Sequence, residues 1–364
     1  MNRLIIALGI FIIFILSQFS FLLMAQEIRP VRDNVGFCWN PSVMDELMEY
    51  LKSNSGTGED FRSDNLVAAI SPHDDYLYAA GVYYPLYKLI NVKEVVIFGV
   101  THGTVRKAMN DPKNILILDD YKYWQRPYGN VDISPLREEI KNSLDKDDYS
   151  VSDSAQNIEH SIEALVPFLQ YYNRDVKITP VMVTQMPFER MNQVSEKLSE
   201  IISAYITKNK LEPGKDIFFL ISSDANHYGK DFDNIPYGED EAAHLKATEN
   251  DKRIAGNAFN GILTKGKIEN LTKELWGKPT DAPPSPVWCG KFSIPFGLLT
   301  ISKIIKRING YELNGIVYKN SDSWTEGVIP IKHTNMGLTA PFSLKHWVGW
   351  FSAGFYLSKN NTDK

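Results

Sequence analysis

The chain has 364 residues, 43% of them hydrophobic, which is enough apolar material for one large core or two modest ones. Charged residues make up 23% of the chain, near the globular average, and this excludes extensive disorder in its body. The formal net charge is -5 and the body carries no basic run. This excludes a broad nucleic-acid-binding surface, because phosphate contacts require clustered Lys and Arg.

The first 25 residues form a segment of their own. Arg3 is followed by an uncharged, mostly apolar run over 4–25, which is long for a signal peptide and just long enough to cross a bilayer. Ala25 supplies a small residue for cleavage, so we expect a cleaved signal peptide, with an uncleaved anchor as the alternative. In both cases we expect the body from Gln26 to be exported to the periplasm or cell exterior, with membrane contact only through this segment and only if it is uncleaved.

The body over 26–357 alternates apolar strands with longer helical stretches. Several strands are continuous apolar runs, as in strands buried on both faces. The predicted strands are 66–71, 94–99, 114–118, 176–183, 216–222 and 315–318. The predicted helices are one beginning at Ser134-Pro135 and those over 161–172, 187–208, 238–263 and 293–308. This predicts one domain, a three-layer α/β/α sandwich with a mixed, mostly parallel sheet, and a disordered tail over 358–364.

Four of the seven histidines stand at strand ends or in the turns just beyond them. In open α/β sheets, ligands bind at the carboxyl ends of the strands. His73 follows the strand over 66–71, His102 follows the one over 94–99, and we expect these two strands to be neighbours. A lone histidine is more often structural than ligating, but this pair predicts a metal site.

Two carboxylates, Asp74 and Asp75, follow His73 directly, and Tyr76 comes next. We expect one of the carboxylates to orient the imidazole of His73, as partners of metal-bound histidines do. The alternative is that His73 is a turn residue held by these carboxylates. All three residues are predicted to lie at the pocket.

His227 stands after the predicted strand over 216–222, within a polar segment that begins at Ser222. Its imidazole can move a proton near neutral pH, and Asp224 can orient it or bind a metal. We predict that these two residues are catalytic. The alternative is a polar loop that caps the next helix.

Cys289 lies between a Pro-rich loop and an apolar helix. A thiolate at a helix N-terminus has a lowered pKa and can bind a metal or act as a nucleophile. With His73 and His102 it would suit Fe, Cu or Zn and leave a position open for substrate. The alternatives are an inert buried thiol and a disulfide with Cys38.

His160 and Ser161 open the predicted helix over 161–172, with Ser161 as its cap and Glu163 in its first turn. We expect His160 and Glu163 to form part of the pocket wall and not to bind metal. The remaining histidines, His244, His333 and His346, are expected on the surface or in the core.

Several short motifs occur in one order from about residue 66 to residue 336. They are Pro72-His73 with Tyr76, Tyr78 and Gly81; Phe98-Gly99 with His102; His160-Ser161 with Glu163 and Pro167-Phe168; Ser222-Ser223-Asp224 with His227-Tyr228; and Cys289-Gly290. The series resembles the MEMO family, whose bacterial and archaeal members are called AmmeMemoRadiSam system protein B. The chain has Asp74-Asp75 where that family usually has Ala-Gly, and Ala225-Asn226 where it usually has Phe-Ser.

The resemblance implies the fold of class III extradiol dioxygenases, which use non-haem iron. It places the metal ligands on His73, His102 and Cys289, with the thiolate where the dioxygenases have a carboxylate, and the acid–base histidine on His227. It also implies binding of Fe(II) or Cu, redox chemistry and, for a eukaryotic member, peptide binding.

Three functions follow as hypotheses. The first is a metal-dependent redox or oxygen-using enzyme that acts on an unknown small molecule. The second is an exported module that binds metal or peptide without turnover and does not need His227. The third is a hydrolase with a Cys289–His227 nucleophile pair.

Overall fold

The computed structural model describes residues 27–54, 61–277, 284–331 and 336–359. The predicted signal or anchor segment, His333 and most of the predicted tail lie outside these ranges, although Ser358 still belongs to the last strand. Within the described ranges, no helix is both long and apolar enough to cross a membrane.

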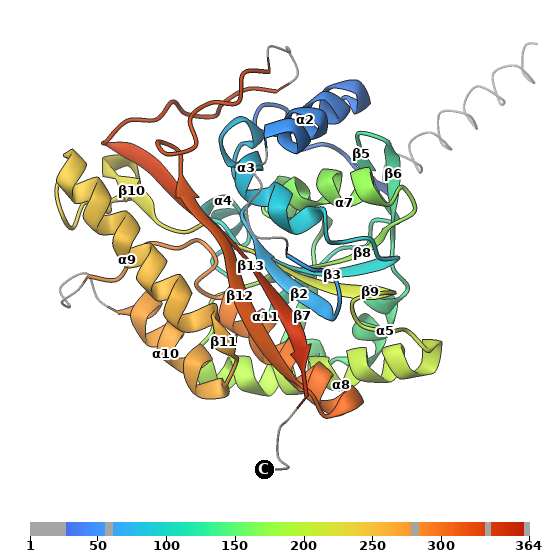
Figure 1. Cartoon of the computed structure of the whole chain (residues 1–364). Coiled ribbons are helices and arrows are strands. Elements are labelled where there is room, and N and C mark those ends of the chain that lie inside the picture. Colours follow the sequence, from blue (N-terminus) through green and yellow to red (C-terminus); the bar gives the residue numbers. More distant parts are fainter. Residues whose placement is uncertain (1–26, 55–60, 278–283, 332–335, 360–364) are drawn as a thin grey trace, which may run out of the picture.

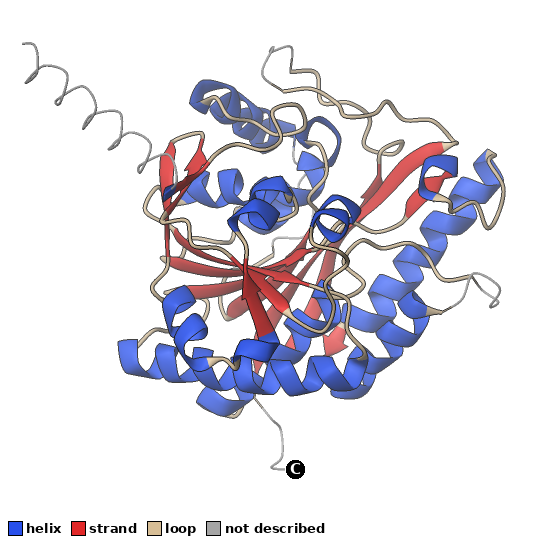
Figure 2. Ribbon diagram, turned by 180° about the vertical axis from the view of Figure 1, so that it is seen from behind, coloured by secondary structure: helices blue, strands red, loops and turns tan. Residues whose placement is uncertain are grey.

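A twisted sheet with helices on both faces forms the centre of the molecule (Figures 1 and 2). Its middle is four parallel strands in the order β8-β3-β9-β2, and nearly all of their residues are buried, as continuous apolar runs predict. Their bounds are Lys177–Val183 for β8, Glu94–Val100 for β3, Ile217–Ser222 for β9 and Leu66–Ser71 for β2. Because the strands are parallel, their carboxyl ends meet at one edge of the sheet.

Antiparallel strands extend the sheet on the β2 side. Strand β13 pairs with β2, β12 pairs with β13, and β10 pairs with the start of β13. The bounds on this side are β10 (His227–Gly229), β11 (Gly261–Ile262), β12 (Glu312–Asp322) and β13 (His346–Ser358). Beyond β8 lie β1 (Ile28–Arg29), β4 (Leu116–Leu118), β5 (Tyr123–Arg126), β6 (Gly129–Ile133) and β7 (Tyr149–Val151). The sheet is therefore mixed, with a parallel middle.

Each face of the sheet carries its own hydrophobic core under a layer of helices. One core lies under α2 (Pro41–Asn54), α3 (Tyr76–Tyr87) and α7 (Val166–Tyr172). The other lies under α5 (Leu136–Ser143), α8 (Phe188–Asn209), α9 (Glu241–Phe259), α10 (Lys265–Trp276) and α11 (Ser293–Asn309). Short helices complete the chain: α4 (Gly103–Ala108), α6 (Asp153–Ile158), η1 (Lys146–Asp148), η2 (Glu163–Leu165) and η3 (Lys230–Phe232). The predicted three-layer α/β/α sandwich is confirmed.

The predicted helix over 161–172 differs in its first turn. It begins as the 3₁₀ turn η2 at Glu163 and becomes α-helical only at Val166. Ser161 does not cap it, because its hydroxyl instead bonds the backbone of Val100 at the end of β3. This contact joins the turn before η2 to the sheet edge.

Candidate metal centre

Three residues at the carboxyl edge of the sheet stand at equivalent places. His73, His102 and Asp224 each lie two residues beyond the end of a strand, namely β2, β3 and β9. The strands that carry the two histidines are not neighbours, contrary to the sequence prediction, because β9 lies between them. The strand that leads to Asp224 therefore lies between the strands that lead to His73 and His102.

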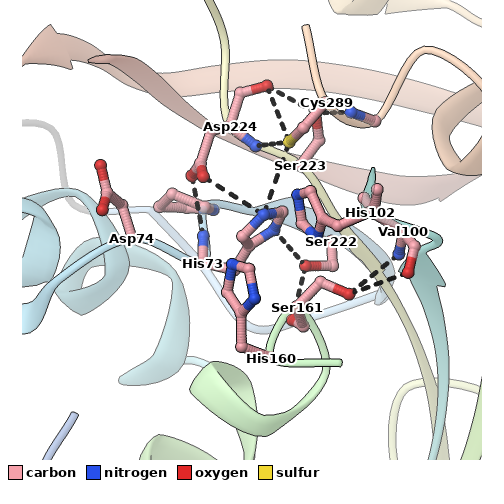
Figure 3. A network of polar contacts seen from close by, with 12 residues as sticks. His73, Asp74, Val100, His102, His160, Ser161, Ser222, Ser223, Asp224 and Cys289 are labelled. Carbon is pink, nitrogen blue, oxygen red and sulfur yellow. Dashed lines mark hydrogen bonds and ion pairs between the residues drawn. The ribbon is translucent and has the colours of Figure 1, made fainter. Parts of the chain in front are cut away.

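The three predicted ligands converge (Figure 3). One nitrogen each of His73 and His102 and the sulfur of Cys289 lie within 4.8 Å of one another. Cys289 Sγ is 3.5 Å from His73 Nε2, and the two imidazole centroids are 5.1 Å apart. When ligand atoms bind one ion at 2.0–2.3 Å each, the distances between those atoms are similar to the ones found here. The two imidazole nitrogens and the sulfur therefore fit a single metal ion.

Hydrogen bonds fix which nitrogen of His73 faces this point. Its Nδ1 lies 2.7 Å from Ser222 Oγ, and that hydroxyl donates its only proton to the Ser161 carbonyl, also at 2.7 Å. The Nδ1 atom must therefore carry the proton that it shares with Ser222, which leaves Nε2 as a lone pair directed at Cys289. Ser222, and not Asp74 or Asp75 as predicted, orients this imidazole.

Glu159 does the same for His102. Its Oε1 accepts from His102 Nδ1 at 2.8 Å, and its Oε2 accepts from the His102 backbone N–H at 2.9 Å. It also accepts the backbone N–H groups of His160 and Ser161. Burial raises the pKa of this carboxyl, but His102 and His160 outweigh burial and hold the pKa well below its ordinary value. Glu159 was not predicted from the sequence, although an acidic residue directly before His160 was the available signal.

Cys289 lies in the turn before α11, four residues ahead of its first residue. The backbone N–H of Asp224 donates to its sulfur at 3.0 Å. Burial, with a contribution from Asp224, raises the pKa of the thiol well above its ordinary value. The expected lowering by the helix dipole is therefore wrong for the ion-free chain, and a neutral thiol is a poor nucleophile. Binding of a metal cation to the sulfur would displace the thiol proton and release it, because the thiolate is the form that ligates.

The alternative disulfide does not form, because both cysteines are free. Cys38 is fully buried in the core under α2 and α3, where its sulfur contacts the Asn40 carbonyl. Cys289 thus stays available to a metal.

The two predicted catalytic residues lie at the same centre. One oxygen of Asp224 accepts from the His73 backbone N–H at 2.9 Å, and the other is 3.3 Å from His73 Nε2. Donor atoms of Asp224, His227 and Cys289 lie within 4.8 Å of one another. His227 Nδ1 contacts the Ala225 carbonyl at 3.2 Å, so Nδ1 is the donor and Nε2 is free to accept a proton. Burial lowers the pKa of His227 to about 4, so its ring is neutral at neutral pH.

A cavity of about 380 Å³ opens over the centre. His73, His160, Asp224 and His227 line its inner part, and a segment that includes Arg32 and Asp33 lines its mouth. The His160 ring stacks on His102 at 4.5 Å, and burial lowers its pKa to about 4. His160 therefore lies in the pocket wall.

The other predicted pocket residues have different positions. Asp74 and Asp75 line the cavity, but Asp74 lies to one side of the histidines in Figure 3. Burial raises the pKa of Asp75 to about 7 and also raises that of Asp74. Tyr76 is fully buried behind the cavity, where its hydroxyl donates to the Ala164 carbonyl. Glu163 also lies behind it and pairs with the buried Arg29.

Although Glu163 is not among the described residues that line the cavity, it holds the backbone of the segment at the cavity mouth. Its carboxylate accepts the backbone N–H groups of Arg32 and Asp33 at 2.8 and 2.9 Å.

Of the remaining histidines, His244 is buried 3.2 Å from Asp322, and His346 pairs with the exposed Asp231.

Comparison with known proteins gives the family. The model of the family described as Memo-like protein matches residues 38–323. A MEMO1 family protein of Saccharolobus islandicus is 34% identical over 180 residues, 47% of this chain and 57% of the relative. MEMO1 family proteins of Methanosarcina mazei and Aquifex aeolicus are 29% and 31% identical over 47% and 44% of this chain, and over 58% and 54% of their own lengths. The alignments thus span a little over half of these relatives. The match over residues 38–323 covers most of the chain, which therefore belongs to the MEMO family.

Proposed function

We propose that this chain is an exported, metal-dependent oxidoreductase of dioxygenase-like type that holds Fe(II) or Cu between His73, His102 and Cys289. The observation that supports it most directly is that one ring nitrogen each of His73 and His102 and the sulfur of Cys289 lie within 4.8 Å of one another. Imidazole and thiolate donors suit Fe, Cu and Zn, and Zn is the alternative ion. When bound, an ion of the first two kinds would supply the redox chemistry, and three protein ligands leave positions open for substrate.

The residues around the ligands supply proton handling and shape. His227 has a donor atom close to those of Asp224 and Cys289, and its ring is unprotonated near neutral pH, so its Nε2 can take a proton from a substrate hydroxyl. Asp224 accepts the His73 backbone N–H and places a buried carboxyl group beside the ligands, and burial raises the pKa of this carboxyl well above its ordinary value. Glu159 and Ser222 hold the two imidazoles in the tautomers that ligation needs.

The first experiment measures metal content. The protein is purified, loaded without oxygen with Fe(II), Cu or Zn in turn, and its bound metal is counted by mass spectrometry. Cys289→Ser should lose most of the bound metal, because it removes the thiolate. Cys38→Ser is the matched control and should retain metal, because Cys38 lies in a core away from the centre. A folded wild-type protein that takes up none of the three ions would refute the proposal.

The second experiment separates an enzyme from a module that binds metal or peptide without turnover, and His227 is the discriminating residue. His227→Gln should abolish oxygen consumption with small organic reductants while metal affinity stays near that of the wild type. Turnover that survives this change would remove His227 from the mechanism. Wild-type protein that binds metal but never turns over would favour the non-catalytic module.

Export is tested by fractionation and N-terminal sequencing of the mature protein. Our proposal expects the protein outside the cytoplasm with Gln26 as its first residue. An intact N-terminus in the membrane fraction would instead indicate the anchor.

A further inference from the structure

A second cavity of about 340 Å³ adjoins the cavity over the metal centre. The two cavities share four lining residues, His227, Asp74, Asp75 and Thr339. A ligand in the second cavity would therefore lie beside the proposed proton acceptor and next to the space over the metal ligands. Its volume suits a single ring with a short side chain.

Aromatic side chains form the walls of the second cavity. Tyr78 from α3 and Trp347 from β13 are almost fully buried, and Phe232 and Phe342 are partly buried. Phe232 packs edge-on against His227 at 5.0 Å, and Phe342 stacks on Trp324 at 5.8 Å. These contacts fix the rings in place, so the cavity offers preformed apolar surface to a ligand.

Acidic side chains are the second feature of this cavity. Asp74 and Asp75 line it, whereas its described lining includes no Lys or Arg. Within the described residues, the Asp74 carboxyl group accepts from two neutral groups, the Asp75 backbone N–H and Trp350 Nε1. Asp75 accepts the backbone N–H and hydroxyl of Thr339. Across the described ranges, neither carboxyl group forms an ion pair with Lys or Arg, and His346, which also lines the cavity, favours the charged form of Asp74.

The segment after β12 builds the outer wall. Thr339, Phe342 and Trp347 follow residue 323, where the match to the family model ends. Residues of the matched part hold this segment, since Asp75 binds Thr339 and the Tyr78 hydroxyl accepts from the Phe342 backbone N–H at 3.0 Å. The cavity therefore depends on a part of the chain that the family model does not cover.

We propose that the second cavity binds an organic amine, with an aromatic or apolar body against its ring walls and a protonated amino group at Asp74 and Asp75. This inference rests on the proposed function, because it names the substrate class of the same site. Charge and shape argue together for an amine, since aromatic faces and carboxylates both attract a cation. An anionic ligand would meet two acidic side chains and no described Lys or Arg in this cavity.

The test uses three probes of equal chain length: phenethylamine, 2-phenylethanol and 3-phenylpropionate. Binding to the full chain at pH 8, with and without metal, is measured by calorimetry and ligand-observed NMR. Phenethylamine should bind roughly ten-fold more tightly than 2-phenylethanol, and 3-phenylpropionate should bind most weakly. Equal affinities, a preference for the acid, or no binding of any probe at millimolar concentration overturns the inference.

Substitutions in the second cavity, with one remote control, test whether the amine binds there. Asp74→Asn should remove the preference for the amine, Phe342→Ala should weaken the amine and the alcohol alike, and the remote Asp145→Asn should change neither. An amine preference that Asp74→Asn retains, or wild-type affinity for both probes in Phe342→Ala, places the amine elsewhere and overturns the inference. If Asp74→Asn fails to fold, the wild-type series and Phe342→Ala still decide it.

The metal dependence separates this inference from the proposed function. A chain that takes up no metal but prefers the amine would refute the proposed function and leave the amine site standing. A chain that holds metal and shows no preference would refute the amine site alone.

Discussion

Hydrogen-bond partners of single residues decide what the ring nitrogens at this centre can do. Ser222 and Glu159 accept from the Nδ1 atoms of His73 and His102, and this leaves both Nε2 atoms free for a metal. The spacing of the histidines predicted the ligands, but it could not reveal these partners. They come from segments about 60 to 150 residues away in the chain.

The first prediction concerns Glu159. Glu159→Gln keeps the size of the side chain but removes the negative charge and puts an amide N–H₂ beside backbone donors. Metal affinity should fall roughly 10- to 100-fold, as it does when a partner of a ligating histidine is lost. Competition with a metal-binding dye measures the fall. The exposed Glu138→Gln serves as the control, and unchanged affinity in Glu159→Gln would show that His102 needs no such partner.

The elements around the centre are connected by close backbone approaches and by buried polar bonds. Gly290, in the turn before α11, lies against Ser223 after β9, where an added Cβ would stand 2.2 Å from Ser223 Oγ. Asp251 on α9 accepts from the Nε1 of Trp288, the residue before Cys289. The position of the sulfur thus depends on how three elements pack.

The second prediction follows from Gly290. Gly290→Ala should displace the turn that carries Cys289, lower stability by about 1–3 kcal/mol and weaken metal binding. Denaturant unfolding and metal titration measure the two effects. Gly103→Ala is the matched control, because its Cβ would only reach an ordinary contact with Arg106 at 3.8 Å. Equal behaviour of the two variants would contradict the crowding argument.

The third prediction concerns Asp251 and pH. Burial raises the pKa of this carboxyl from 3.8 to about 7, so the folded chain binds its proton more tightly than the unfolded chain. Protonation of Asp251 therefore stabilises the folded state. This contribution to the free energy of unfolding is fully present below the pKa of Asp251 in the unfolded chain, 3.8, and is lost as the pH rises through its pKa in the folded chain, about 7. Asp251→Asn cannot ionise, so its free energy of unfolding relative to the wild type should increase between about pH 5 and pH 8. Urea titrations at both pH values test this, and a constant difference would contradict it.

The whole molecule brings distant segments to one edge of its sheet. The parallel strands place residues 73, 102 and 224 together, and the turn before α11 adds Cys289. Because the donors are set in a folded scaffold, ion binding should be coupled to global stability.

The fourth prediction concerns the coupling between metal binding and the stability of the fold. At a free metal concentration of 100 times its Kd, the bound ion should stabilise the fold by about 2.7 kcal/mol, provided that it does not bind the unfolded chain. Calorimetry should show a higher Tm for the loaded protein, and a chelator should reverse the change. Cys289→Ser should show little of this shift, while Cys38→Ser should show it in full. A Tm that does not respond to metal in the wild type would argue against the site.

The sequence predicted the middle of the fold closely. The strand over 66–71 matches β2 at both ends, because β2 is continuously buried and apolar. The helix over 187–208 matches α8 within one residue, because its apolar residues recur with the helical period. Helix α3 was missed because it is apolar on all sides, so it shows no amphipathic period. Strand β13 and helix α10 were also missed, and 315–318 proved to be one part of the longer β12.

By itself, the sequence determined the α/β class, the family motifs and the residue types of the centre, because strand burial and motif order are local properties of the chain. Only the tertiary structure decided that β9 separates the strands of His73 and His102, that Cys38 stays away from Cys289, and that Glu159 orients His102. It also decided that Asp74 and Asp75 face a second cavity. The physical reason is that these relations join segments distant in the chain, and neither hydrophobic period nor local spacing encodes which strand lies beside which.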